Sequence, residues 1–278
     1  MDQVKKQTQI IVVACFPKSG STFLARKLAA LPTCVFEPLV PFGERREQEL
    51  DEGVIREVLR KHEGGHVIGQ QHVRLNWHTA NLAMKYPIRF VVLVRDLMDC
   101  LISLDDHMSN ESKLFPQSFW SNRLYDDLSK AKLSRIHAVT VTNAPWFINF
   151  YLSWVLWKEE YPEIPPPLFL TYSQLFQNLE STMTSLVSEF GIKAGQTDIM
   201  RVLEEQTFSR LNKGISGRGR EYFLRDRAAA SALDQIIQCY PTVDFSLIYK
   251  HIRSRERFNR AITSVRTKVL SVFTNKCL

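Results

Sequence analysis

The sequence is poor in cysteine, and its few cysteines are not spaced as metal ligands or as a disulfide framework. Their number is odd and no C-x-x-C pair occurs, so neither a zinc ribbon nor a set of disulfides is implied. No apolar run reaches the ~18 residues of a membrane span. The short run from Ile10 leads into a loop instead of a small-residue cleavage site, so we expect no secretory signal peptide. These absences favour a reducing, cytoplasmic location. The five cysteines are Cys15, Cys34, Cys100, Cys239 and Cys277.

Internal repeats and low-complexity tracts are also absent, and 278 residues are enough for one full hydrophobic core. We therefore expect a single domain over residues 1–278. The net charge of +7 is uneven, because residues 250–278 hold eight basic residues and one acid. The rest of the chain is balanced and gives no indication of a nucleic-acid partner. The basic segment 250–278 has apolar residues at helical spacing, which predicts a C-terminal helix docked on the domain, with a membrane-surface helix as the less favoured alternative.

The most informative segment is an apolar, β-branched run from Ile10 to Cys15 that stops at a proline, turns, and restarts as a helix. This strand-loop-helix pattern is typical of a phosphate-binding loop. Gly20 lets the backbone approach an anion, the first amides of the helix face it, and Lys18, Ser21 and Thr22 add a charge and hydroxyl donors. The segment is not the nucleotide triphosphatase loop, in which the Lys follows the second Gly.

Two further strands are predicted to end at chemically useful residues. Residues 66–73 deliver His72 at a strand's carboxyl end, where ligands bind in open α/β sheets. Residues 89–95 are apolar on both faces, as in a central parallel strand, and run into Arg95. A helix follows and carries Ser103, eight positions after that arginine. Arginine is suited to holding an anion with two parallel hydrogen bonds.

The remaining segments alternate between helix and strand signals. We predict helices over residues 44–62, 146–161, 179–190 and 197–206, and short extended pieces at residues 35–39 and 168–172, the latter ending at Tyr172. Residues 109–145 are polar and irregular, which predicts a lid on the acceptor side. Residues 207–220 form a loop rich in Gly and Arg. His62 and His66 are four apart, but Gly64-Gly65 interrupts any helix that would align them, so we expect no metal site.

Three of these segments together resemble the sulfotransferases that use 3′-phosphoadenosine 5′-phosphosulfate (PAPS). FPKSGSTFL resembles the 5′-phosphosulfate-binding loop, Arg95 with Ser103 resembles the 3′-phosphate motif, and residues 207–220 resemble the late Arg-Lys-Gly-x-x-Gly loop. The resemblance covers roughly residues 10–222. It implies an α/β fold of one domain, with three α/β/α layers, a central mostly parallel sheet and a P-loop-like phosphosulfate loop. It also implies PAPS as co-substrate and no metal. The residues implied to bind the nucleotide are Lys18, Ser19, Gly20, Ser21, Thr22, Phe23, Arg95, Ser103, Tyr172, Phe208, Lys213 and Gly214.

The sequence departs from the family pattern at three places. Asn212 stands where Arg is common, Ser173-Gln174 replaces an acidic pair, and Gln70 stands where Lys is usual. The last departure leaves the leaving-group charge more dependent on Lys18.

The resemblance also implies a reaction, the in-line transfer of a sulfuryl group to a hydroxyl or nitrogen of a small-molecule acceptor. Lys18 stabilises the leaving phosphate. His72, 23 positions before Arg95, matches the histidine base of the cytosolic branch. Phe36-Glu37-Pro38-Leu39 resembles a segment of the carbohydrate branch, in which a Glu is the base, so Glu37 in a carbohydrate or glycolipid sulfotransferase is the second-ranked alternative. Asp105 and Asp106 suggest a cationic natural product as acceptor.

Two other classes of protein remain open at this stage. A P-loop-like nucleotide kinase or hydrolase would share the strand-loop-helix pattern and would use Asp96 as its magnesium carboxylate. A non-catalytic nucleotide-binding or membrane-surface protein would depend on the basic C-terminal segment instead.

Overall fold

The computed structural model describes residues 8–41, 48–111, 134–205 and 217–250, and the side chains of 108–111 are outside this description. The predicted sites Phe208, Lys213 and Gly214 therefore lie outside the described residues, as do residues 112–133 of the predicted lid and residues 251–278 of the basic C-terminal segment.

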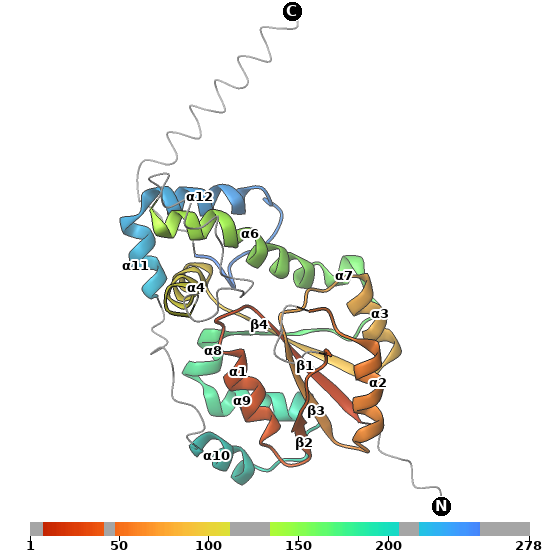
Figure 1. Cartoon of the computed structure of the whole chain (residues 1–278). Coiled ribbons are helices and arrows are strands. Elements are labelled where there is room, and N and C mark those ends of the chain that lie inside the picture. The colour runs from red at the N-terminus through yellow and green to blue at the C-terminus, as the bar shows by residue number, and fades with distance from the viewer. Residues whose placement is uncertain (1–7, 42–47, 112–133, 206–216, 251–278) are drawn as a thin grey trace, which may run out of the picture.

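A five-stranded sheet forms the centre of the molecule (Figure 1), in the order β2-β3-β1-β4-β5. Every pairing among these strands is parallel. The central strand β1 is flanked by β3 and β4, so the carboxyl ends of these three strands meet at one edge of the sheet. The strands are β1 (Gln9–Cys15), β2 (Cys34–Phe36), β3 (His66–Gln71), β4 (Ile88–Val94) and β5 (Leu168–Thr171).

Helices cover both faces of the sheet (Figure 1), which confirms the predicted single α/β/α domain. One apolar core joins the sheet to α2, α3, α4, α6, α11 and α12, and the other joins it to α1, α8, α9 and α10. The helices are α1 (Ser21–Ala29), α2 (Glu52–Lys61), α3 (Trp77–Lys85), α4 (Leu97–Glu111), α6 (Arg135–Val155), α7 (Trp157–Glu160), α8 (Tyr172–Gln177), α9 (Leu179–Glu189), α10 (Gln196–Glu204), α11 (Arg218–Arg225) and α12 (Arg227–Gln238).

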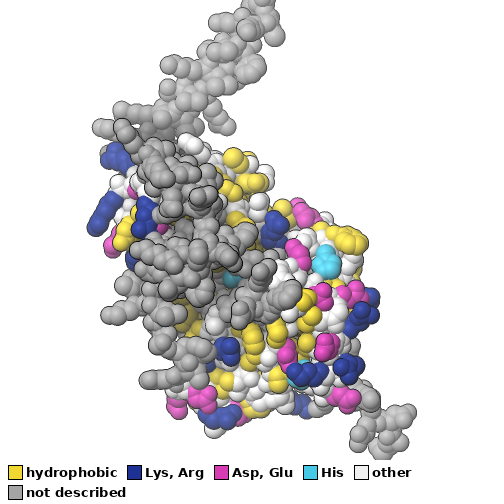
Figure 2. All heavy atoms as spheres, in the orientation of Figure 1, with side chains coloured by type: hydrophobic (Ala, Val, Ile, Leu, Met, Phe, Trp, Pro, Cys, Tyr) yellow, Lys and Arg dark blue, Asp and Glu magenta, His cyan; other side chains and the backbone are white. Residues whose placement is uncertain are grey.

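Strand β1 is apolar on both of its faces, which is why the sheet has an apolar core on each side. Ile10, Val12 and Ala14 belong to one core and Ile11, Val13 and Cys15 to the other, and all are 0% exposed. Since successive side chains of a strand point to opposite faces, an uninterrupted apolar run must be covered on both sides. On the face shown in Figure 2, acidic and basic side chains are interspersed where the described residues are visible.

Two predicted helix boundaries were wrong. Helix α2 begins at Glu52 and not near residue 44, because the Asp51 carboxylate accepts the Val54 amide and caps the helix there. Helix α6 begins at Arg135, capped by Ser134, and continues through Pro145, where the sequence pattern predicted irregular structure up to that proline. Pro145 is exposed, so water can satisfy the carbonyl that its missing amide leaves without a helical partner.

None of the described helices combines the length and the apolar character that a membrane span requires.

Candidate active site

The loop between β1 and α1 is folded tightly against the sheet. The buried Ser19 hydroxyl donates to the Phe16 carbonyl at 2.7 Å, and the Phe16 amide donates to the Leu93 carbonyl of β4 at 3.1 Å. Lys18 and Gly20 both adopt left-handed backbone conformations, with φ of 67° and 86°. The loop therefore turns back on itself and brings its amides to the carboxyl edge of the sheet.

Helix α1 begins at this loop without a cap from the described side chains, and its first turn holds no acid. As at the start of any α-helix, its first amides have no partner within the helix, and the positive end of the helix dipole faces the loop. The side-chain amide of Gln70, on β3, lies behind this turn and donates to the hydroxyls of Ser21 and Thr22 at 2.6 and 3.3 Å. The arrangement can bind an anion of the size of a phosphate.

Arg95, which follows β4 directly, lies beside this loop. Its Nη1 donates to the Lys18 carbonyl at 2.9 Å, and its guanidinium lies over the Tyr172 ring at 4.3 Å from the centroid. The side chain is 8% exposed. The backbone of Lys18 therefore lies beside the Arg95 guanidinium.

Asp99 connects Arg95 to α11, and sequence reasoning missed it. Its carboxylate lies 3.7 Å from Arg95 Nη2 and accepts the backbone amides of Gly217 and Gly219 at 2.9 and 2.7 Å. The backbones touch so closely that a Cβ at Gly219 would lie 2.2 Å from the Met98 carbonyl carbon. An Asp four positions after the Arg, in the first turn of a helix, was the available signal. Asp99 holds the chain that follows residues 206–216 beside Arg95.

Ser103 is buried on α4, four residues after Asp99 and hence on the same face of the helix. Its position is compatible with a role beside Arg95.

Aromatic side chains gather next to the phosphate-binding loop. The Phe23 and Phe176 rings are 5.1 Å apart, and the Phe176 and Tyr172 rings are 4.4 Å apart. Phe176 also packs on Gly20, since a Cβ there would lie 2.8 Å from the Phe176 ring. Sequence reasoning named Phe23 and Tyr172 but missed Phe176, which joins them. Such a cluster offers flat surfaces for a purine base.

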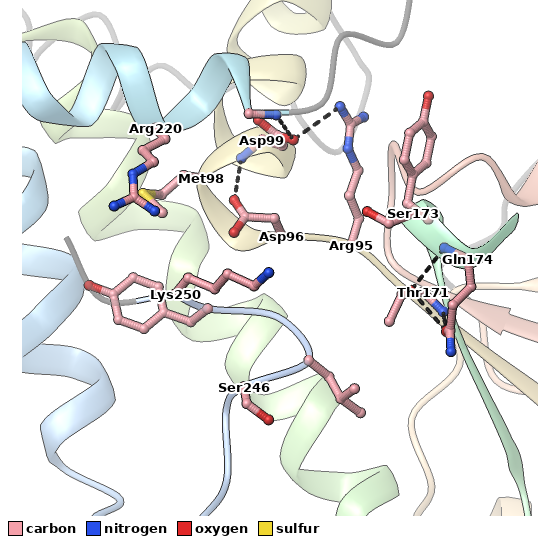
Figure 3. A pocket seen from close by; sticks show the side chains of 14 residues that line it. Arg95, Asp96, Met98, Asp99, Thr171, Ser173, Gln174, Arg220, Ser246 and Lys250 are labelled. Atoms are coloured by element: carbon pink, nitrogen blue, oxygen red, sulfur yellow. Dashed lines mark hydrogen bonds and ion pairs between the residues drawn. The ribbon is translucent and has the colours of Figure 1, made fainter. Parts of the chain in front are cut away.

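A cavity of about 430 Å³ opens beside Arg95 (Figure 3). Arg220 and Lys250 line it and add positive charge. Asp96 also lines it, and burial raises the pKa of its carboxyl to about 6. The cavity draws on four segments of the chain, at residues 95–99, 171–174, 217–220 and 246–250.

His72 follows β3 at the same edge of the sheet. Its Nδ1 lies 2.8 Å from the Cys15 carbonyl oxygen and 3.3 Å from Cys15 Sγ. Because a carbonyl only accepts, Nδ1 carries the hydrogen, and in the neutral imidazole the lone pair is then on Nε2. The Trp146 and His72 rings lie in a T-shaped arrangement, with 6.4 Å between their centroids. The backbone at the end of β1 therefore sets the tautomer that a general base needs.

Glu37 does not lie beside the phosphate-binding loop between β1 and α1. It follows Phe36, which pairs with Ile68, so Glu37 is level with Gly69 and about 10 Å along the sheet from His72. Its carboxylate accepts from Lys61 at 2.6 Å and pairs with the His62 ring at 2.8 Å. These contacts, the Lys61 hydrogen bond first among them, lower the pKa of Glu37.

Asp105 and Asp106 are each paired with an arginine of this chain. Arg135 donates to Asp105 at 2.6 Å, and Arg218 holds both carboxylate oxygens of Asp106, at 2.6 and 3.1 Å. The hydrogen bond from Arg218 to Asp106 also raises the pKa of Arg218. These two carboxylates therefore tie α4 to α6 and α11.

The structure is similar in fold to solved sulfotransferase structures. Mouse sulfotransferase SULT7A1, solved in complex with PAP, superposes with a TM-score of 0.57 at 14% identity over 86% of each chain. Retinol dehydratase in complex with androsterone and inactive cofactor PAP aligns over 85% of this chain and 82% of its own, with a TM-score of 0.49 at 14% identity. A sulfotransferase from Alicyclobacillus acidocaldarius aligns over 86% of this chain and 98% of its own, with a TM-score of 0.47 at 11% identity. No protein-family model and no curated protein matches the sequence. The likeness to SULT7A1 confirms the predicted fold.

Proposed function

We propose that this protein is a PAPS-dependent sulfotransferase that transfers the sulfuryl group to a hydroxyl or nitrogen of a small acceptor. The observation that carries the proposal is the 2.9 Å hydrogen bond from Arg95 to the Lys18 carbonyl, which joins the two sequence motifs that resemble the phosphate sites of PAPS enzymes. The PAP bound in SULT7A1, on the same fold, supports the same nucleotide here.

The nucleotide is proposed to bind with its 5′-phosphate at the start of α1, against Lys18 and the loop amides. Its 3′-phosphate is proposed to bind Arg95, with Ser103 beside it. The aromatic cluster of Phe23, Tyr172 and Phe176 provides the surface for adenine. Phe208, Lys213 and Gly214 are proposed, from the resemblance alone, to close over the adenosine.

Lys18 is proposed to supply the charge that drives the reaction. As the sulfuryl group leaves, the 5′-phosphate oxygen gains negative charge, and a cation beside it stabilises the transition state more than the ground state. The proposal includes no metal. The remaining contribution is positioning of the two reactants in line, as in phosphoryl transfer.

His72 is the proposed base that removes the acceptor's proton. Hydrogen bonding of Nδ1 to the Cys15 carbonyl leaves the lone pair on Nε2. Glu37 is less suited, since its carboxylate is paired with Lys61 and His62 and its pKa is lowered, which makes it a weaker base. A carbohydrate or glycolipid sulfotransferase with Glu37 as base therefore ranks second. Trp146 of α6 lies beside His72 and directly follows residues 109–145, which supports that segment as the acceptor side.

Two finer points follow from the paired carboxylates and the thiols. Because Asp105 and Asp106 are occupied by Arg135 and Arg218, they give no support to a cationic acceptor. The four described cysteines are free thiols, which fits the proposed cytoplasmic location.

A nucleotide kinase or hydrolase is the weaker candidate. Its magnesium would need an ionised carboxylate, and Asp96, the residue available, accepts the Asp99 amide in its own turn and has a raised pKa.

Incubation with PAPS and a panel of acceptors in EDTA, followed by mass spectrometry, tests the proposal. We expect acceptors to gain the mass of one sulfuryl group. His72→Asn should lower turnover by on the order of 10² or more, whereas Glu37→Gln should leave it within a few-fold. A strict requirement for ATP and magnesium would favour the kinase instead, and a large loss in Glu37→Gln alone would favour the second-ranked base.

A further inference from the structure

Gln70 is a polar side chain that is buried beside the apolar core. It lies on β3, level with Val13 of the central strand, and it shares a sheet face with Ile68, which packs in the core beneath α1. Gln70 is 6% exposed. Burying an amide among apolar groups costs free energy unless its hydrogens are bonded. The partners of Gln70 therefore indicate why the residue is there.

Both hydrogens of the Gln70 amide have acceptors in the phosphate-binding turn. Nε2 lies 2.6 Å from Ser21 Oγ and 3.3 Å from Thr22 Oγ1. A hydroxyl that accepts a hydrogen bond from an amide must direct its own hydrogen elsewhere. Both hydroxyls stand at the start of α1, in the same turn as the loop amides to which the 5′-phosphate is proposed to bind.

We propose that Gln70 is a positioning residue for the 5′-phosphate, which turns the hydroxyls of Ser21 and Thr22 into donors aimed at that group. The inference rests on the proposed function and deepens it. A neutral amide orients donors without adding positive charge, so this site gains direction from Gln70 and charge from Lys18.

Gln71 provides a matched control. It is the next residue of the same strand, it is 2% exposed, and its Nε2 donates to the Gln48 carbonyl at 2.7 Å. Successive strand residues point to opposite faces, so Gln71→Met removes an equally buried amide without touching Ser21 or Thr22.

The test compares two ligands, PAP and adenosine 3′-phosphate, by isothermal titration calorimetry in EDTA. The ratio of their dissociation constants measures what the 5′-phosphate contributes to binding. We expect Gln70→Met to reduce this ratio about tenfold while the affinity for adenosine 3′-phosphate stays unchanged. Gln71→Met should lower the melting temperature and leave the ratio unchanged. A merely structural role for Gln70 would weaken both ligands together.

Two further variants keep the inference falsifiable if Gln70→Met does not fold. Gln70→Asn keeps the amide but is one methylene too short to reach both hydroxyls, so it should reduce the same ratio. In a Ser21→Ala background, the effect of either Gln70 substitution should shrink, because one of the two oriented hydroxyls is gone. An unchanged ratio in Gln70→Met or Gln70→Asn would overturn the role of Gln70 and leave the proposed function standing. Failure of the wild-type protein to bind PAP would overturn both.

Discussion

The two strand-to-helix turns at the carboxyl edge of the sheet are built differently. After β1, the chain passes through two left-handed residues into α1, which has no acid in its first turn and no cap from the described side chains. After β4, the Asp96 carboxylate accepts the Asp99 amide at 3.1 Å, and Asp99 itself stands in the first turn of α4. The turn after β1 holds no carboxylate, whereas the turn after β4 uses its own carboxylates to accept backbone amides.

Because of this difference, we expect the two turns to bind an anion in different ways. At α1, backbone amides and the helix dipole add to Lys18. At α4, the carboxylates of Asp96 and Asp99 oppose a second anion near the helix, so the guanidinium of Arg95 must bind it. We therefore expect the turn after β1 to control the chemical step and the turn after β4 to control nucleotide affinity.

Lys18→Met should have the largest effect. Turnover should fall by on the order of 10² or more, because no other described side chain of the turn carries a positive charge to the leaving phosphate. Steady-state kinetics at saturating PAPS measures it. Arg26→Met is the control, since Arg26 is an exposed cation of the same helix that lies over Phe36, and its loss should change turnover little. Equal losses in the two variants would show that overall charge, and not the position of Lys18, matters.

Arg95→Met should act on binding rather than on turnover. We expect the KM for PAPS to rise by on the order of tenfold or more, with a smaller change in kcat, because the guanidinium is proposed to bind the 3′-phosphate, away from the reacting sulfur. Arg89→Met, which removes an arginine from the other end of β4, is the matched control and should leave KM unchanged. A fall in kcat with unchanged KM would contradict the division between the turns.

Gly20→Ala tests the geometry of the first turn. A left-handed φ of 86° strains any side chain, and the new Cβ would lie 2.8 Å from the Phe176 ring. We expect a loss of more than about 1 kcal/mol in the free energy of unfolding, measured in urea. Gly191→Ala has a φ of 62° with open space around it, so it isolates the strain. If the two substitutions cost the same, Phe176 does not pack on the loop.

The pH dependence of stability in the variant Asp96→Asn tests the turn after β4. The raised pKa, about 6 against about 4 in an unfolded chain, means that the folded state binds the proton more tightly. The Asp96 contribution to stability therefore falls as pH rises from about 4 to about 6 and stays low above that. Asp96→Asn should match the wild type near pH 4 and become the more stable protein near pH 7. A constant difference across this range, in thermal or urea unfolding, would show that Asp96 is not buried as described.

Much of the framework could be predicted from the sequence because the sheet is buried on both faces. The β-branched runs at 10–15 and 89–95 predicted the two central strands, and the loop between Phe16 and Gly20 was located by its proline and glycine. The helix over residues 135–145 was not predicted, because a proline usually marks the end of a helix. In the fold Pro145 is exposed, and the helix can continue through it. Helices α3, α11 and α12 carried no motif and were not predicted.

The candidate site was predictable only where residues follow one another in a strand-to-turn motif. Lys18 and Arg95 were found in this way, and their hydrogen-bonded contact is a finding of the structure. Phe176 and the partners of Asp99, Asp105 and Asp106 depend on which helices pack together. Spacing along the chain does not contain that information. Likewise, the contacts of Glu37 with Lys61 and His62 depend on where α2 ends.

One binding experiment tests most directly whether both turns hold the two phosphate ends of a single nucleotide. PAP, AMP and adenosine 3′-phosphate are titrated in EDTA into the wild-type protein, Lys18→Met and Arg95→Met. The account predicts that Lys18→Met weakens PAP and AMP but not adenosine 3′-phosphate, and that Arg95→Met weakens PAP and adenosine 3′-phosphate but not AMP. If both variants weaken all three ligands equally, or if the wild-type protein binds none of them, the account is wrong.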